Sequence, residues 1–235
     1  MNRIIATARM QLVNTQTFIW VPLIVIGGAF VINWLIFAIV AGGLGQVPER
    51  GDSFTGASQA PLWYFLVIGV QSLTLTFPFS QAMSVARRTF FLGTALVTAA
   101  AGALLATLYT LLRIPEMATN GWGVGAYMFN VRWVTDGPWY EGWLFFFALT
   151  LLFFVIGFWA ATVYKRFGTL VITVILTALA LAVIGVIALI TWQRWWMNVG
   201  LWLDTLTPLS TALWVLVVTV VLGASSYLTL RRAVP

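Results

Sequence analysis

An arginine pair followed closely by a phenylalanine pair, Arg87-Arg88-Thr89-Phe90-Phe91, is the segment best suited to contact another protein. Arginine can make two parallel hydrogen bonds to a carboxylate, and a phenylalanine ring can fill a pocket on a partner. With Met83 and Val85 on its N-terminal side, the segment predicts a compact helical knob that carries basic and apolar surfaces. The same residues could serve only as a topology signal beside a membrane-buried phenylalanine pair. The pattern alone does not choose between these interpretations.

A second set of candidate residues consists of neutral polar side chains inside long apolar runs. Hydroxyl and amide groups in such runs need hydrogen-bond partners, so their faces should point to other helices or to a wetted path. A substrate path at a subunit interface would be lined by Asn33, Gln71, Thr74, Thr173 and Thr177. The favoured interpretation is instead ordinary hydrogen bonding between helices. Threonine can also satisfy its hydroxyl by bonding to the backbone of its own helix.

Several chemistries lack their residues in this chain. It contains no histidine and no cysteine, which excludes histidine-ligated haem, histidine- or cysteine-bound zinc, serine–histidine catalysis and disulfides. No glycine-rich phosphate loop with lysine and serine or threonine occurs, so the chain is not expected to bind ATP by itself in the usual way. The sequence predicts no cofactor, no metal site and no catalytic residue here. An interfacial lipid enzyme would have only three carboxylates to use as a base: Asp136, Glu141 and Asp204.

Membrane-spanning helices must position these candidate residues. The chain is 61% hydrophobic and only 8% charged, whereas about a quarter of the residues of a soluble domain are charged. Spans of roughly 20 residues each would fill about half of it and leave no room for a sizeable soluble domain. We therefore predict one all-α transmembrane domain, 1–235, with six spans: 18–41, 61–82, 93–112, 140–164, 170–192 and 209–230.

The charges predict the orientation of these spans. Short polar breaks alternate between purely basic ones and ones that hold every carboxylate. Cytoplasmic loops collect Lys and Arg, so both termini are expected in the cytoplasm. The two sides then carry +8 and −2, which accounts for the net charge of +6 without a nucleic-acid partner. Tryptophans such as Trp122, Trp192 and Trp202 fall near the outward ends, where indoles favour the interface.

The segments outside the spans differ in character. Residues 2–17 have an apolar face and a polar face on a helical projection, which predicts an amphipathic helix lying in the membrane interface. Residues 42–60 are rich in glycine, serine and proline and predict an irregular loop. Residues 113–139 are rich in aromatic side chains and are expected to fold back along the interface. There they would shape an exit vestibule or cap the bundle.

The whole pattern resembles a known family. Six spans, an amphipathic leader, and Phe77-Pro78-Phe79 running into Ser84-Val85-Ala86-Arg87-Arg88-Thr89-Phe90-Phe91-Leu92-Gly93-Thr94 are similar to permease subunits of exporter-type ABC transporters. The likeness is to the ABC type-2 class, in its short bacterial form with a separately encoded ATPase. The resemblance implies that the loop between spans two and three is a coupling helix on the ATPase. Its docking residues would be Ser84, Val85, Arg87, Arg88, Thr89, Phe90 and Phe91.

The resemblance also implies the working assembly. Two permeases, identical or paired with a paralogue, would enclose a path through the bacterial cell membrane, and two ATPase subunits would bind below. An accessory or assembly subunit of another membrane complex is the alternative, and an interfacial lipid enzyme is the third. The substrate is not specified by any motif.

Overall fold

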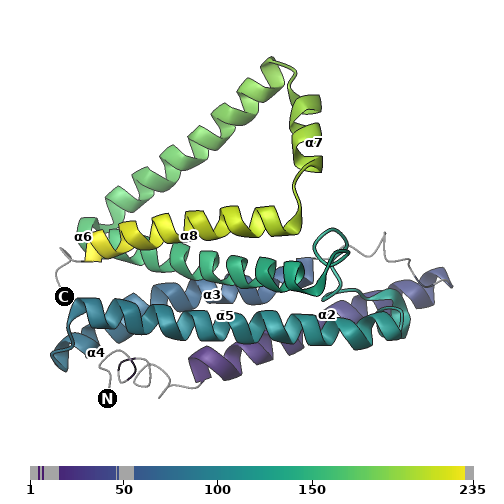
Figure 1. The fold of residues 1–235 in the computed structure, drawn as a ribbon, viewed down its shortest axis with the longest axis horizontal. Coiled ribbons are helices and arrows are strands. Elements are labelled where there is room, and N and C mark those ends of the chain that lie inside the picture. Colours follow the sequence, from purple (N-terminus) through teal and green to yellow (C-terminus); the bar gives the residue numbers. More distant parts are fainter. Residues whose placement is uncertain (1–4, 6, 8–15, 46, 48–55, 231–235) are drawn as a thin grey trace.

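The computed structural model describes residues 5, 7, 16–45, 47 and 56–230, and every regular element in this part of the chain is a helix. The α-helices, labelled in Figure 1, are α2 (Val21–Leu44), α3 (Ala60–Gln71), α4 (Phe77–Ala82), α5 (Arg87–Ala118), α6 (Trp139–Trp192), α7 (Trp196–Asp204) and α8 (Pro208–Leu230). Five segments are long and apolar enough to cross a membrane: 18–43, 56–82, 87–118, 139–192 and 208–230. The prediction of an all-helical chain built for a membrane is confirmed at this level.

The centre of the bundle is a close crossing of α3 with the first half of α6. Gly69 of α3 and Gly157 of α6 face each other there. A Cβ atom on Gly69 would collide with the carbonyl oxygen of Phe154, and one on Gly157 with the carbonyl oxygen of Leu66. The two backbones can therefore approach only because both residues are glycine, which is how membrane helices often gain packing contact.

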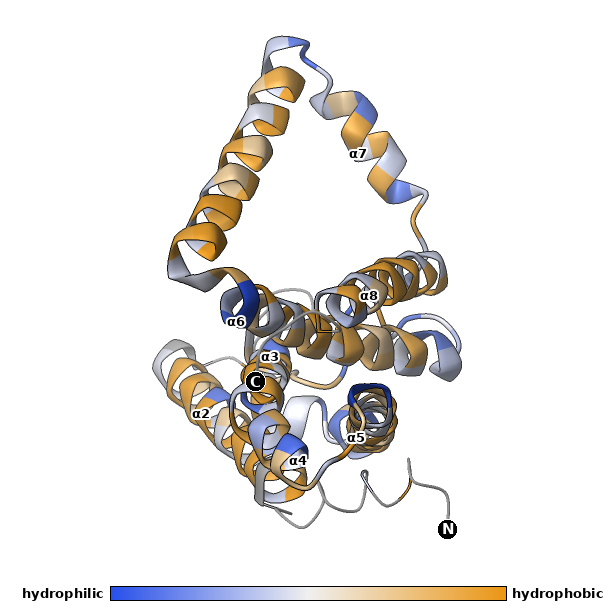
Figure 2. Cartoon of the chain, turned by 90° about the vertical axis from the view of Figure 1, so that its left-hand side faces the viewer, coloured by the Kyte–Doolittle hydropathy of each residue, from blue (hydrophilic) through white to orange (hydrophobic). Residues whose placement is uncertain are grey.

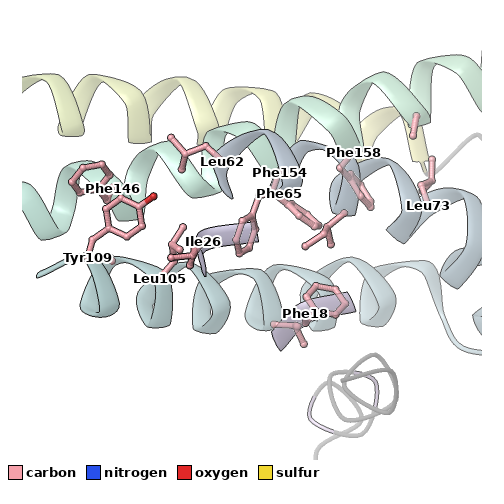
Figure 3. Packing of buried hydrophobic residues seen from close by; sticks show 14 of the residues in the cluster. Phe18, Ile26, Leu62, Phe65, Leu73, Leu105, Tyr109, Phe146, Phe154 and Phe158 are labelled. Carbon is pink, nitrogen blue, oxygen red and sulfur yellow. The ribbon is translucent and has the colours of Figure 1, made fainter. Parts of the chain in front are cut away.

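Aromatic and aliphatic side chains fill the space around this crossing. Figure 3 shows Phe65 of α3, Tyr109 of α5 and Phe154 of α6 pointing into a shared core. The Tyr109 ring lies 4.6 Å from that of Phe146, and its hydroxyl donates to the carbonyl of Ser58 at 2.7 Å. A buried tyrosine hydroxyl needs such a partner, so this bond ties α5 to the turn before α3.

The outer surfaces of the helices are apolar as well. Figure 2 shows apolar residues around much of α2, and Ile24 and Ile39 on it are 66% and 74% exposed. A helix that is apolar on every side is typical of a membrane span. Helix α2 thus presents hydrocarbon outward along much of its length.

Helix α6 joins the segments expected as spans four and five. The sequence predicted spans over 140–164 and 170–192, and one helical element, Trp139–Trp192, covers both. It is interrupted at Gly168, whose φ of 79° and ψ of −178° are non-helical. That conformation suits glycine, which has no Cβ atom to clash. The chain bends there without a loop, because a single residue is enough to redirect it.

Beyond Gly168 the chain leaves the bundle. Figure 1 shows the second half of α6 pointing away from the other helices, with α7 leading back to α8. We call residues 169–206 the projecting arm. Its most apolar stretch has a mean hydropathy of 3.0 and no buried residue. Helix α7 was not predicted, because the short stretch between spans five and six holds too few apolar residues to suggest a span.

Other helices begin or end at residues that differ from the predicted bounds of the spans. Span three was expected at 93–112, whereas α5 runs over Arg87–Ala118, because helical structure continues past the apolar run that marks a membrane core. Span two is interrupted by a π-helical turn, Ser72–Thr76, just before Pro78. The predicted interfacial helix at 2–17 lies almost wholly outside the described residues. The predicted irregular loop at 42–60 is described only in part, and α2 extends into it to Leu44 while a 3₁₀ turn, Gly56–Gln59, leads into α3.

Candidate functional site

A tight turn joins α4 to α5 and presents the predicted docking residues at one end of the bundle. The turn covers Met83–Ala86, where Ser84 has a left-handed φ of 56°. The amide of Ser84 donates to the carbonyl of Gln81 at 2.9 Å. The amide of Val85 donates to the carbonyl of Ser80 at 3.0 Å, and the Gln81 side chain returns a bond to the Val85 carbonyl at 3.1 Å. We call residues 83–89 the basic turn.

The two arginines of the basic turn have different surroundings. Arg87 is half-buried and donates from Nη1 to the carbonyl of Leu230 at 3.1 Å, at the C-terminal end of α8. A cation is favourable at that end, where the last carbonyls lack helical partners. Arg88 and Ser84 are exposed, and Thr89 is half-buried. Arg87 therefore joins two helices, whereas Arg88 points to the surroundings.

The phenylalanine pair packs inside the bundle. Phe90 is fully buried, and its ring lies 5.3 Å from that of Phe77. Phe91 is half-buried between Phe158 and Tyr227, at 6.0 and 5.2 Å between ring centroids. Docking by Phe90 would require it to leave the core. A surface at this turn is instead made by Ser84, Arg88 and the half-buried Val85 and Thr89.

The structure differs from the predicted compact knob in the length of the helix that carries the arginine and phenylalanine pairs. Residues 87–91 are the first turns of a helix of 32 residues and do not form a separate short helix. Ala86 is extended, with φ of −62° and ψ of 137°, so the helix begins at Arg87 and continues without a break past Phe91.

The residues predicted for a substrate path do not meet within one chain. Asn33 is buried in α2, and Gln71 and Thr74 are half-buried at the end of α3 and in the π-helical turn. Thr173 and Thr177 lie on the projecting arm and are exposed. Figures 1 and 2 agree that this arm points away from α2 and α3. A path lined by all five residues stays a prediction about an assembly of two chains.

These polar residues also differ in their hydrogen-bond partners. The hydroxyl of Thr74 donates to the Val70 carbonyl at 3.0 Å, and that of Thr173 to the Thr169 carbonyl at 2.9 Å. Both satisfy the competing interpretation of bonding to their own helix. Asn33 differs, because its side-chain Nδ2 is buried without a hydrogen-bond partner.

Sequence reasoning missed a buried carboxylate at the opposite end of α5. Glu116 is fully buried and accepts bonds from three consecutive backbone amides. The donors are Met128 at 2.6 Å, Phe129 at 3.0 Å and Asn130 at 2.6 Å. The indole of Trp122 adds a fourth at 3.3 Å. The sequence offered only a weak signal, a lone acid before an aromatic-rich stretch.

The Glu116 carboxylate organises the segment that joins α5 to α6. We call residues 119–138 the cap. Phe129 of the cap lies 5.2 Å from Tyr109 of α5, and Trp122 lies 5.0 Å from Phe30 of α2. The Trp34 indole donates to the Trp122 carbonyl at 3.4 Å. The cap therefore folds back onto α5 and α2. Its expected course along the membrane interface stays a prediction.

No protein-family model, no curated protein and no solved structure matches this chain. Within the described residues, no three His, Cys, Asp or Glu side chains gather as metal ligands would. Helix α5 joins the exposed basic turn at one end to the bond network of the buried Glu116 carboxyl group at the other.

Proposed function

We propose that this chain is the transmembrane permease subunit of an ATP-driven transporter of the ABC class, an exporter in a bacterial cell membrane. Two such chains, identical or paralogous, would enclose the path, and two separate ATPase subunits would hold ATP and Mg²⁺. The observation that carries the proposal is the basic turn, which is exposed at Ser84 and Arg88 and built directly onto two long helices through Arg87.

The proposal includes six crossings with both termini on the basic side. Helix α6 has 54 residues, which would extend about 81 Å at 1.5 Å per residue. The hydrocarbon core of a bilayer is only about 30 Å thick. The bend at Gly168 divides α6 into two lengths that each suit one crossing. Lys165 and Arg166 precede this bend, which favours the same side as the basic turn.

Motion would pass through the helices that meet at the basic turn. When the ATPases close, they would push on Arg88 and Ser84. Because Arg87 is bonded to Leu230 and Phe91 packs on Phe158, α5 would carry α8 and α6 with it. At about 48 Å for its 32 residues, α5 would transmit this shift to the cap through Glu116. The chain would transduce motion, and the ATPase would supply the energy.

Gentle purification from the native membrane, followed by mass spectrometry, tests this function. We expect a soluble ATPase in about equimolar amount, bound to the wild-type protein and lost from Arg88→Glu. Arg88 is the informative choice because it is exposed, whereas Arg87 bonds within the fold. The control is Arg194→Glu, which makes the same charge change at an exposed site beyond α6. Retention of the ATPase by Arg88→Glu, or loss in both variants, would contradict the proposed docking site.

The accessory-subunit alternative draws on a different observation, the projecting arm. An apolar helix without any buried residue in its most apolar stretch suits contact with another membrane protein. A photo-crosslinking amino acid in place of Thr177 distinguishes the two functions. A permease should crosslink to a second permease chain. An accessory subunit should crosslink to an unrelated membrane protein and copurify with no ATPase.

A further inference from the structure

A cavity of about 490 Å³ lies between α5, the first half of α6 and α8. Pockets that hold small molecules occupy about 300–1,000 Å³. Small residues create the space: Ala95 and Ala99 line it from α5, and Gly223 and Ala224 from α8. Phe154 and Phe158 of α6 complete the wall. A Cβ atom built on Gly223 would meet nothing within 4 Å, so this glycine borders open space.

Three threonines line the cavity and differ in their hydrogen bonds. The hydroxyl of Thr94 donates to the Phe90 carbonyl at 2.9 Å, and that of Thr219 to the Val215 carbonyl at 2.8 Å. Thr98 is only 2% exposed, yet its hydroxyl has no hydrogen-bond partner. A buried hydroxyl without a partner is costly and calls for an explanation. Among these three, Thr98 alone has a hydrogen bond left to give.

The depth of Thr98 restricts what it could contact. It lies ten residues beyond Arg88 on α5, which corresponds to about 15 Å along the helix axis. With Arg88 at the headgroup level, Thr98 lies inside the hydrocarbon core. The ester groups of a phospholipid stay near the headgroups. The group that meets Thr98 therefore belongs to a molecule that enters the apolar interior.

We propose that this cavity binds a small lipophilic molecule that is hydrocarbon over most of its surface and carries one carbonyl oxygen, which Thr98 recognises. The Thr98 hydroxyl is buried as it stands. Threonine in a helix uses two χ1 settings, and binding requires the one that turns this hydroxyl toward the cavity. The Phe154 and Phe158 rings, 6.1 Å apart, would contact the hydrocarbon part. This inference concerns binding by the chain itself and does not depend on an ATPase.

Two photoactivatable probes test the proposal on the purified full chain in lipid nanodiscs. One is a diazirine-bearing palmitic acid methyl ester, and the other is a diazirine-bearing alkane of the same length without the carbonyl. Peptide mass spectrometry locates and quantifies the labelling. We expect the ester to label peptides of α5, α6 and α8 at the cavity, about three- to tenfold more strongly than the alkane, as one hydrogen bond allows.

Matched threonine variants assign the carbonyl recognition. Thr98→Val keeps the side-chain shape and should remove the preference for the ester, while its melting temperature equals or exceeds that of the wild type. The control Thr94→Val lies in the same cavity but loses a hydroxyl that is already bonded, so it should keep the preference. Gly223→Leu should fill the cavity and abolish labelling by both probes.

Three results would overturn the proposal. Equal labelling by the ester and the alkane would remove the carbonyl from the recognition. If Thr98→Val still prefers the ester over the alkane, another residue recognises the carbonyl. Labelling of the same peptides by a diazirine phosphatidylcholine, undiminished by excess methyl palmitate, would identify the occupant as a bilayer lipid. None of these results depends on ATPase capture, so the proposed function is tested separately.

Discussion

Glu116 shows how a single residue can order a whole segment. Its two carboxyl oxygens accept from the amides of Met128, Phe129 and Asn130, so three successive donors converge on one carboxyl group. Bonds to an ionised carboxylate are about twice as strong as neutral ones. Arg113 and Thr135 both bond to the Asn130 side-chain oxygen, at 3.2 and 2.7 Å, and extend the network through the cap.

We expect Glu116→Gln to loosen the cap. The amide has one acceptor oxygen, and its NH₂ group would face a backbone donor, which leaves at least one buried donor unpaired at a cost of about 1–3 kcal/mol. Hydrogen exchange at Met128–Asn130 should accelerate by about 5- to 150-fold. Glu141→Gln is the control, because Glu141 lies at the start of α6 and accepts none of these bonds. Unchanged exchange in Glu116→Gln would contradict the role assigned to the carboxylate.

The crossing of α3 and α6 shows how elements depend on particular residue sizes. Gly69 and Gly157 let the two backbones touch, and the large rings of Phe65 and Phe154 then close around them. In lipid, helices associate mainly through such close packing, because the surrounding chains are as apolar as the helices. The crossing therefore positions α6, and with it one wall of the cavity near Thr98.

Gly157→Ala should destabilise the bundle although alanine favours helix formation. The new Cβ atom would overlap the Leu66 carbonyl oxygen and push α3 away from α6. Overpacking of this kind costs about 1–3 kcal/mol, which should appear as a lower melting temperature in detergent. Gly102→Ala is the matched control, because its Cβ atom would have no neighbour nearer than 3.5 Å. That variant should melt at or above the wild-type temperature, since alanine exceeds glycine in helix propensity by about 1 kcal/mol.

At the scale of the whole molecule, the described chain divides into a packed bundle and the projecting arm. The bundle joins α2, α3, α5, α8 and the first half of α6, whereas Figure 1 shows the arm on its own beyond Gly168. Three exposed indoles of the arm, Trp192, Trp195 and Trp196, lie within two residues of the turn at Arg194. Tryptophan gathers at membrane interfaces, so this turn should lie at a membrane surface.

The absence of cysteine in the natural sequence allows the topology to be measured directly. Single substitutions Ser84→Cys, Phe167→Cys and Arg194→Cys place thiols at exposed turns. With six crossings, an impermeant maleimide should label Ser84→Cys and Phe167→Cys from one side and Arg194→Cys only from the other. Intact cells and inverted vesicles provide the two orientations. Labelling of Ser84→Cys and Arg194→Cys from the same side would contradict the six-span scheme.

Local features of the sequence were enough to predict where the long helices occur and roughly where most of them begin and end. Long apolar runs with so few charges are typical of membrane-spanning helices, and this expectation needs no knowledge of any contact. The aromatic residues of 113–139 likewise predicted that this stretch folds back.

The packing of the helices against one another, and not their individual sequences, sets which side of each helix meets which neighbour. Because these helices are apolar on all sides, their sequences carry little information about which side of a helix is buried. Phe90 is an example: the sequence allowed it to lie outside the core, but it packs against Phe77. The Glu116 network joins residues 12 to 14 positions apart, through backbone amides that any sequence possesses. The cavity at Thr98 exists because α5 and α8 are held apart by their packing on α6. Such spacing depends on three helices together, so no single helical stretch can specify it.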